Sequence, residues 1–224
     1  MGEHSEHMPA ERPPGSLTEM GSGGAAPGEM MGEHSEHVEA PPTDDPIRPD
    51  LHRAPSVVVL NTGDGKGKST AAFGVMVRAI ARGWNVAVCQ FIKSNEWKVG
   101  EEALGRQLGV DWHALGDGFT WNSKDMDETE ARAREAWLTS KEKLASGEYE
   151  MVLLDEITYP INYGWIDIDE VATAIRGRPE HVNVIATGRD APAGLIDVAD
   201  TVTEMTKVKH AFDRGVRAKR GIDL

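Results

Sequence analysis

Cysteine and long apolar runs are nearly absent from this sequence. The 224 residues include a single cysteine, Cys89, so no disulfide can form within the chain, and we expect a reducing, cytoplasmic environment. No apolar run approaches the roughly 18–20 residues that cross a bilayer, and the first residues do not read as a secretion signal. We therefore expect no membrane association. Cys89 lies in the apolar stretch 86–92, which favours a buried packing role over a reactive one.

Aromatic residues are missing altogether from residues 1–50. This segment has no Phe, Trp, Tyr or Cys, holds 8 of the 12 prolines, and carries 11 acidic and 2 basic side chains. Such a composition buries too little apolar surface to offset the entropy of ordering, so residues 1–50 are expected to form a disordered acidic tail and residues 51–224 the folded domain. The tail repeats MGEHSEH at Met1 and Met31, each copy with two histidines three residues apart. The pairs are either a weak metal- or partner-binding feature or part of a duplicated solvated linker.

Basic residues are too few for a nucleic-acid-binding surface. Residues 51–224 hold 26 acidic and 22 basic side chains, so the folded part is mildly acidic, with a net charge of −4. A general nucleic-acid binder normally carries a basic patch. We therefore expect no nucleic-acid partner.

Short apolar runs alternate with helical patterns beyond residue 55. This alternation predicts an α/β fold with a mostly parallel central sheet that is covered on both faces, as in three-layer P-loop (RecA-like) domains. Ligands of such folds bind beyond the carboxyl ends of the strands. The predicted strands are 57–60, 86–92, 151–154, 182–186 and 201–205, and the predicted helices are 71–81, 125–145 and 169–175.

A glycine- and lysine-rich loop between the first strand and the first helix is the strongest functional signal. The usual phosphate-loop pattern is GxxxxGK[ST], but its first glycine would fall at Thr62 and comes one residue later here. The glycines allow a tight turn whose N–H groups face an anion, and the start of the next helix adds partial positive charge. An incidental glycine-rich turn is the alternative. The predicted nucleotide-binding residues in the loop are Gly63, Asp64, Gly65, Lys66, Gly67, Lys68, Ser69 and Thr70.

Two adjacent carboxylates end the apolar run 151–154. Asp155 and Glu156 are expected at the end of a buried strand, where an acidic residue can hold a nucleotide-bound Mg²⁺ or Mn²⁺ together with the Ser69 hydroxyl. A solvated or structural role for this pair is the alternative. A triphosphate site of this kind is shared by hydrolases, kinases and switches, so it does not define the reaction.

Further motifs resemble those of the bacterial corrinoid adenosyltransferases, in the order of that family and over roughly residues 57–224. The loop with its displaced glycine is itself the form found in the family. The matching segments are TGDGKGKSTAAFG from Thr62, QFIK from Gln90, GFTW from Gly118, LDEITY from Leu154, TGR from Thr187, VKHAFD from Val208 and GID from Gly221.

This resemblance implies that the chain transfers the 5′-deoxyadenosyl group of ATP to Co(I) of a corrinoid and releases tripolyphosphate. The cobalt is then the nucleophile, while the protein aligns the reactants and stabilises the leaving group, Lys68 above all. Phe119 and Trp121 would lie under the corrin ring, exclude the lower axial ligand and ease reduction of Co(II). Arg189 would clamp phosphate, or else form only a surface ion pair. His210 is expected to make a structural or polar contact, because an axial ligand would oppose that reduction.

The family also implies a homodimer and an electron-donating reductase as partners. Two other functions stay open on sequence grounds. One is an ATPase or small-molecule kinase, which would cleave at the γ-phosphate. The other is a non-catalytic carrier of a corrinoid or nucleotide, which would bind without turnover.

Overall fold

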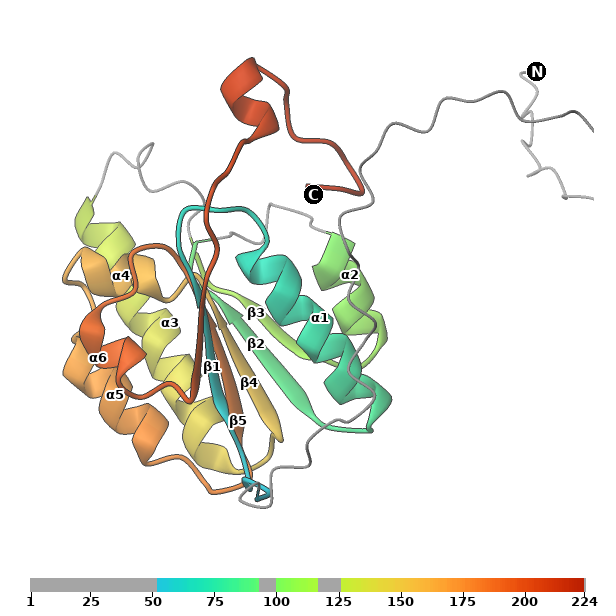
Figure 1. Ribbon diagram of the computed structural model, residues 1–224. Helices are drawn as coiled ribbons and strands as arrows, with labels where there is room; N and C mark the ends of the chain where they lie inside the picture. Colours follow the sequence, from blue (N-terminus) through green and yellow to red (C-terminus); the bar gives the residue numbers. More distant parts are fainter. Residues whose placement is uncertain (1–51, 93–99, 117–125, 224) are drawn as a thin grey trace, which may run out of the picture. The chain divides into compact units, whose positions relative to one another are not determined.

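The computed structural model describes residues 52–92, 100–116 and 126–223, and these build a six-stranded sheet with helices on both faces (Figure 1). Every pairing between neighbouring strands is parallel, in the order β3-β2-β4-β5-β1-β6, which agrees with the predicted α/β class. The strands are β1 Val58–Thr62, β2 Val86–Gln90, β3 Asp111–Ala114, β4 Met151–Asp155, β5 Asn183–Thr187 and β6 Thr201–Glu204.

Helices connect most of the successive strands of the sheet. α1 and α2 cover one face of the sheet, and α3, α4, α5 and α6 lie on the other (Figure 1). The helices are α1 Lys68–Ala81, α2 Gly100–Gln107, α3 Met126–Ser146, α4 Thr158–Asn162, α5 Ile168–Arg176 and α6 Ala193–Ile196, with a 3₁₀ turn, η2, at Ala211–Arg214.

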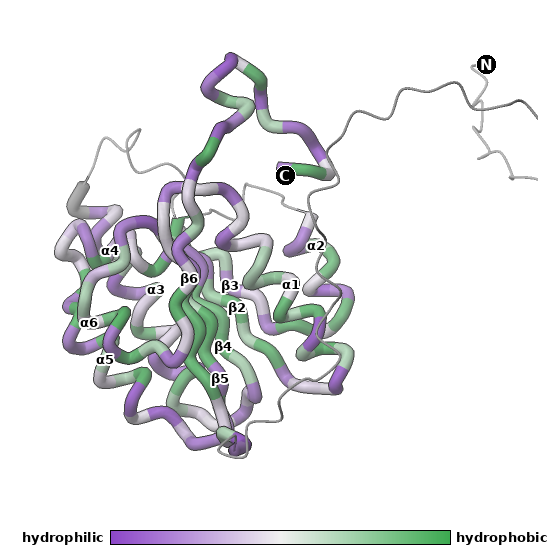
Figure 2. Tube along the Cα trace, viewed as in Figure 1, coloured by the Kyte–Doolittle hydropathy of each residue, from purple (hydrophilic) through white to green (hydrophobic). Residues whose placement is uncertain are grey.

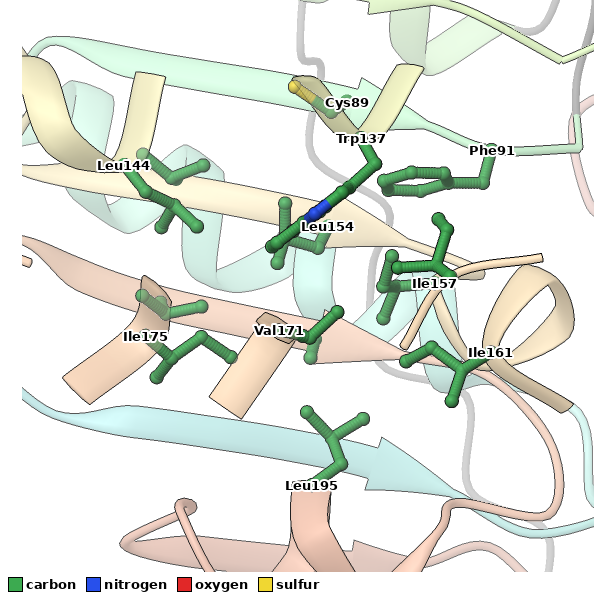
Figure 3. Close-up of a cluster of buried hydrophobic side chains, with 14 of the residues drawn as sticks. Cys89, Phe91, Trp137, Leu144, Leu154, Ile157, Ile161, Val171, Ile175 and Leu195 are labelled. Carbon is green, nitrogen blue, oxygen red and sulfur yellow. The ribbon is translucent and has the colours of Figure 1, made fainter. Parts of the chain in front are cut away.

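Two hydrophobic cores lie on opposite faces of the sheet because successive strand residues point to opposite sides. Trp137 and Leu144 of α3 and Ile175 of α5 pack on one face together with Cys89 and Leu154 (Figure 3). On the other face, α1 packs against the sheet around Phe73, Met76 and Trp112. Apolar residues accordingly concentrate along the central strands, while the helices carry both apolar and polar residues (Figure 2). The single cysteine is fully buried, as predicted, and this burial raises the pKa of its thiol to about 11.

Several elements differ from the sequence-based expectations. α1 begins at Lys68 rather than residue 71, so the last residues of the phosphate loop form the first turn of the helix. β2 ends at Gln90, two residues before the predicted end. Some short elements were not predicted, because each lacks a β-branched run or a long helical repeat. These elements are β3, α2, α4 and α6. Among the described helices, none is long and apolar enough to cross a membrane.

Candidate functional site

The phosphate loop follows β1 at the carboxyl edge of the sheet, where the loops after β4, β5 and β6 also lie. Lys66, Lys68 and Ser69 from the loop line one cavity with Glu156 after β4 and Arg189 after β5. This cavity measures about 320 Å³ and is also lined by Gly67, Thr70, Ile92, Glu101, Tyr159 and Asp223. The fold therefore brings residues 66–70, 156 and 189 together, as the phosphate-site prediction required.

The loop backbone turns sharply into α1. Gly67 is the N-cap residue of the helix. Its φ of 117° is one that residues other than glycine rarely adopt. The first turn of an α-helix has N–H groups with no acceptor inside the helix, and here these belong to Lys68, Ser69 and Thr70. Buried Asn61, which ends the preceding strand with Thr62, donates from Nδ2 to the Lys68 carbonyl at 3.2 Å and braces this turn. The helix start is thus preorganised to receive an anion.

Lys68 lies across the loop rather than extending into solvent. Its Nζ donates to the carbonyl oxygens of Gly63 and Gly65 at 2.7 and 2.8 Å. Partial burial, and then the neighbouring positive charge of Arg189, lower the pKa of Lys68, while the carboxylate of Glu156 opposes this effect. An anionic ligand would offset the repulsion between Lys68 and Arg189 and favour the charged form of the lysine.

Two of the loop glycines are required by a neighbouring segment. The N–H of Gly65 donates to the carbonyl of Met205 at 2.6 Å, so this amide faces the chain that leaves β6 rather than a ligand. A Cβ on either Gly63 or Gly65 would lie 2.6 Å from the Met205 carbonyl oxygen. The close approach of two backbones therefore accounts for these glycines in addition to the turn itself.

The adjacent carboxylates Asp155 and Glu156 have different surroundings. Asp155 is fully buried, and its two oxygens accept from Thr187 Oγ1 at 2.8 Å and from Gln90 Nε2 at 2.9 Å. Glu156 is half-buried, lines the cavity, and has a φ of 64°, which is uncommon for a residue other than glycine. Its N–H donates to Thr187 Oγ1 at 2.9 Å. One carboxylate thus points into the sheet and the other lines the cavity.

A buried chain of hydrogen bonds runs through the carboxylate of Asp155 and spans four strands. Trp112 Nε1 on β3 donates to Gln90 Oε1 on β2 at 2.9 Å, and Gln90 in turn donates to Asp155 on β4. Thr187 on β5 completes the chain by donating to Asp155 and accepting from Glu156. Buried polar groups of this kind hold their positions when every member has a partner. This network could not be predicted from the sequence, because its members are brought together only by strand register.

Arg189 faces the loop from the end of β5. Its Nη1 lies 3.6 Å from Asp64 Oδ1, and both side chains are more than half exposed, so this pair contributes little to stability. Arg189 thus forms the surface ion pair that was one of the two alternatives and also lines the cavity, while the phosphate clamp stays a prediction. The preceding Gly188 has no room for a side chain, since a Cβ there would collide with Thr158 of α4.

Tyr159 lies between the cavity beside the glycine-rich loop and a second hollow. Tyr159 and Ile92 line both, and the second hollow also includes Phe91, Leu115, Gly116, Trp165 and four further residues of α3 and α4. Burial, followed by the charge of Glu156, raises the pKa of Tyr159, so its phenol keeps its proton and can donate a hydrogen bond. Its motif was noted in the sequence, but no role was assigned to it.

Phe119 and Trp121 lie outside the described residues, and so does the tail with its histidine pairs. His210 makes the polar contact expected of it, because its Nδ1 accepts from the Phe212 N–H and caps η2. Within residues 52–92, 100–116 and 126–223, no three or more His, Cys, Asp or Glu side chains gather as a metal-binding group.

Comparison with known proteins identifies the family. Residues 55–224 match the profile of the ATP:corrinoid adenosyltransferase family BtuR/CobO/CobP. The chain is 44% identical over 167 residues to the corrinoid adenosyltransferase of Escherichia coli K12, which covers 75% of this chain and 85% of that protein. The same figures hold for corrinoid adenosyltransferase CobA of Salmonella typhimurium, and the Pseudomonas aeruginosa enzyme is 41% identical over 170 residues, or 75% of this chain and 83% of that one.

A solved structure, domain III of the Thermotoga maritima replication initiation protein DnaA, aligns with 66% of this chain and 53% of its own at a TM-score of 0.34 and 11% identity. A likeness of this size carries no argument about function. The family match covers the phosphate loop, both carboxylates and Arg189. The chain therefore belongs to the ATP:corrinoid adenosyltransferase family.

Proposed function

We propose that this member of the family transfers the 5′-deoxyadenosyl group of ATP to Co(I) of a corrinoid, in the biosynthesis or salvage of adenosylcobalamin, with the triphosphate in the cavity beside the phosphate loop. The observation that carries this assignment is the meeting of Lys66, Lys68 and Arg189 in one cavity at the start of α1. Three cations and a helix N-terminus at one place suit a ligand with several negative charges.

The chemistry assigns the protein two tasks. Co(I) supplies the electron pair that forms the bond to C5′ of the ribose, and the bond from C5′ to the triphosphate oxygen breaks. The leaving tripolyphosphate gains negative charge, which the lysines, the arginine and the helix amides stabilise. The protein must also hold C5′ in line with the cobalt, because this alignment lowers the entropic part of the activation free energy.

The residues present fit a magnesium ion bound to the nucleotide. Ser69 and Glu156 place one hydroxyl and one carboxylate in the cavity, and Mg²⁺ is typically held by one or two protein oxygens together with phosphates and waters. When bound there, Mg²⁺ (or Mn²⁺) would offset charge on the leaving triphosphate. Asp155 differs, because both of its oxygens accept hydrogen bonds inside the sheet. We therefore assign direct ligation to Ser69 and Glu156, and assign to Asp155 the positioning of Glu156 through Thr187.

We propose that the corrinoid binds over the mouth of the hollow next to Tyr159. The hollow measures about 10 Å³, room for about one water molecule, so it borders the corrinoid rather than encloses it. It is lined mainly by apolar side chains and adjoins the phosphate cavity through Ile92 and Tyr159, as a reaction between the two ligands requires. Phe119 and Trp121 are proposed, from their match to the family motif alone, to exclude the lower axial ligand of cobalt. From membership of the family we also propose that the protein forms a homodimer, receives electrons from a reductase and is located in the cytoplasm.

Product analysis tests the reaction. Protein, Mg²⁺-ATP and chemically reduced corrinoid are mixed, and we expect a light-sensitive cobalt–carbon product together with free tripolyphosphate in equal amounts. Lys68→Ala should lower ATP affinity and turnover by about a hundredfold or more, because it removes a charge-assisted contact to phosphate. Lys141→Ala, which removes an exposed lysine paired with Glu170 on the other face of the sheet, is the matched control and should change neither. ADP and phosphate as products would instead identify a hydrolase or kinase.

A second assay tests the aromatic pair. Phe119→Ala combined with Trp121→Ala should strongly slow the reaction that starts from Co(II) and a reductant, because the lower ligand would no longer be excluded. The reaction that starts from preformed Co(I) should be largely retained. Equal loss in the two assays would show that these residues only support packing.

A further inference from the structure

The chain beyond β6 is tied to the phosphate loop at both of its ends. We call residues 205–223 the C-terminal arm. At its start, the Met205 N–H donates to the Thr62 carbonyl at 2.8 Å, and the Met205 carbonyl accepts from Gly65 N–H at 2.6 Å. The missing side chains of Gly63 and Gly65 make room for this contact. The arm therefore begins against the backbone of the loop.

The end of the arm returns to the same loop through an ion pair. Asp223 Oδ1 lies 2.7 Å from Lys66 Nζ, and Asp223 Oδ2 accepts from the Lys219 N–H at 2.8 Å. Between these anchors the arm rises above the carboxyl edge of the sheet and turns back (Figure 1). Its apolar side chains are largely uncovered there, with Val208 91% and Phe212 75% exposed. One ion pair thus holds the end of a segment that is otherwise loosely packed.

Asp223 places a negative charge beside the cationic groups of the cavity, which Glu101 and Glu156 also line. It lines the phosphate cavity together with Lys66, Lys68 and Arg189, where a carboxylate repels phosphate. The rest of the arm is basic, with six Lys or Arg residues and one other acid, Asp213, between residues 205 and 224. Asp223 therefore occupies, on Lys66, a position that the proposed function gives to an oxygen of the triphosphate.

We propose that Asp223 is a latch: it holds the arm on Lys66 when no nucleotide is bound, and the triphosphate displaces it and frees the end of the arm. The inference rests on the proposed triphosphate site. Both anions are attracted to the same ammonium group while their negative charges repel one another, so the two contacts compete. Closing of the latch also opposes retention of tripolyphosphate, a product whose charge would otherwise hold it in the cavity.

The ion pair between Lys66 and Asp223 is weak enough for the latch to open and close reversibly. The Lys66 and Asp223 side chains are 45% and 24% exposed, and exposed ion pairs change an equilibrium by only about two- to fivefold. Several charge-assisted contacts to a triphosphate exceed this, so the ligand opens the latch. A static role, in which Asp223 aligns Lys66 for phosphate, makes the opposite prediction, because removal of Asp223 would then weaken binding.

Titration calorimetry with inorganic tripolyphosphate and Mg²⁺ separates these roles. The full-length wild type, Asp223→Asn and a control, Glu170→Gln, are compared. The asparagine keeps an oxygen for the Lys219 N–H but loses the charge, and the control removes the same charge from a 2.9 Å ion pair with Lys141 away from the loop. We expect Asp223→Asn to bind tripolyphosphate about two- to fivefold more tightly than the wild type, and Glu170→Gln to match the wild type. Equal or weaker binding by Asp223→Asn overturns the latch.

Hydrogen exchange gives an independent readout. The Ile222 and Asp223 amides donate to the Lys219 carbonyl, and the Lys219 amide donates to Asp223. Tripolyphosphate should speed exchange at these amides in the wild type but not in Asp223→Asn, which has no carboxylate for the ligand to displace from Lys66. Unchanged or slower exchange in the wild type would overturn the proposal. If wild-type protein bound no tripolyphosphate at all, the proposed phosphate site itself would be wrong, which is a distinct result.

Discussion

Asp155 and Glu156 show how two identical charges at adjacent positions receive different roles. The buried carboxylate of Asp155 joins Gln90 and Thr187, whereas the left-handed backbone at Glu156 directs the next side chain to the cavity. A non-glycine residue in this conformation costs about 1 kcal/mol or more, and the surrounding hydrogen bonds maintain it. We read the strain at Glu156 as a means of aiming its carboxylate.

Asp155→Asn tests this division of roles. The amide nitrogen of asparagine would face one donor of the network, either the Gln90 amide or the Thr187 hydroxyl, so we expect a loss of about 1–3 kcal/mol in the free energy of unfolding. Turnover should fall because Glu156 is less well held, while an excess of Mg²⁺ should not restore it. Chemical denaturation and steady-state kinetics across a Mg²⁺ titration measure both effects. Recovery of full activity at high Mg²⁺ would point to direct ligation by Asp155.

The phosphate loop is in backbone contact with the first residue of the C-terminal arm. Gly65 is buried and touches Met205, whereas Gly74 lies on the exposed side of α1 with open space around its Cα. The two glycines therefore have opposite requirements. The first is needed for a close backbone approach, and the second is an ordinary helix position that alanine would suit.

This contrast gives a matched pair of variants. Gly65→Ala should displace Met205 and lower ATP affinity by tenfold or more, since the loop cannot keep its shape around an added Cβ. Gly74→Ala should leave ATP affinity unchanged and stabilise the protein by about 0.5–1 kcal/mol. ATP titrations and thermal melts of both proteins check these outcomes. Normal ATP binding by Gly65→Ala would show that the arm does not constrain the loop.

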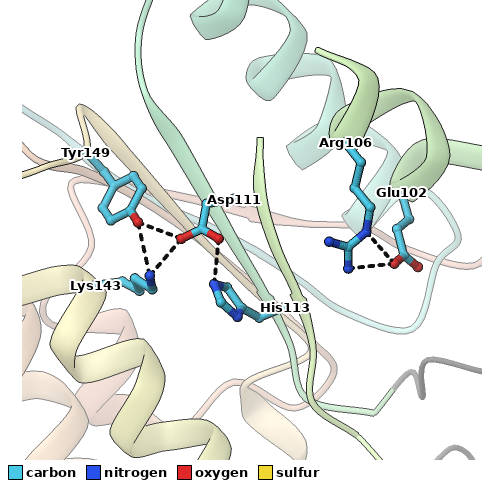
Figure 4. Close-up of polar contacts among 6 residues, drawn as sticks. All are labelled: Glu102, Arg106, Asp111, His113, Lys143 and Tyr149. Carbon is cyan, nitrogen blue, oxygen red and sulfur yellow. Dashed lines mark hydrogen bonds and ion pairs between the residues drawn. The ribbon is translucent and has the colours of Figure 1, made fainter. Parts of the chain in front are cut away.

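A polar cluster joins the edge strand β3 to α3 and the start of β4 (Figure 4). Asp111 Oδ2 accepts from the Tyr149 hydroxyl at 2.5 Å and lies 2.7 Å from Lys143 Nζ. His113 Nε2 is 2.8 Å from Asp111 Oδ1, a close electrostatic contact that lacks hydrogen-bond geometry. Burial works against the charge of Asp111, but the contacts with Lys143, Tyr149 and His113 outweigh it and lower its pKa well below the usual range.

The lowered pKa of Asp111 predicts how the free energy of unfolding depends on pH. Because the pKa of Asp111 is depressed in the folded state, its contribution to stability is full above the unfolded value of about 3.9 and is lost as the pH falls toward the folded value. Asp111→Asn should therefore cost about 1 kcal/mol at pH 7, a figure reduced for a side chain that is 36% exposed. The difference from wild type should shrink at the acid end of a series of denaturation curves between pH 7 and pH 3. A constant difference would exclude an electrostatic origin.

The chain as a whole divides its charge unevenly. Residues 1–50 carry a net charge of −9 out of −13, and the match to the family begins at residue 55. The composition of this segment predicts that it adds nothing to the folded core. Deletion of residues 1–50 should leave the melting temperature within about 2 °C and turnover within twofold. Differential scanning fluorimetry and the product assay test this expectation, and a large drop in melting temperature would show that the segment packs on the domain.

Local patterns in the sequence were sufficient to identify the α/β class and the family, and they predict the phosphate loop. Each depends on neighbouring residues: β-branched runs favour strands, glycines with lysines favour an anion-binding turn, and the turn leads into a helix. The short edge strand Asp111–Ala114 was missed for the same reason, since it alternates polar and apolar residues over four positions only. Its strand conformation comes from pairing with β2.

The contacts that orient the site depend on residues far apart in the chain. Gln90 and Asp155 become partners because β2 and β4 pair in one register, and Lys66 meets Asp223 because the arm folds back over the loop. Nothing near Asp155 in the sequence distinguishes it from Glu156; burial at the centre of the sheet does. The residue types were readable from the chain, but their roles follow from packing, because hydrogen bonds and ion pairs form between whatever groups the fold brings within about 3 Å.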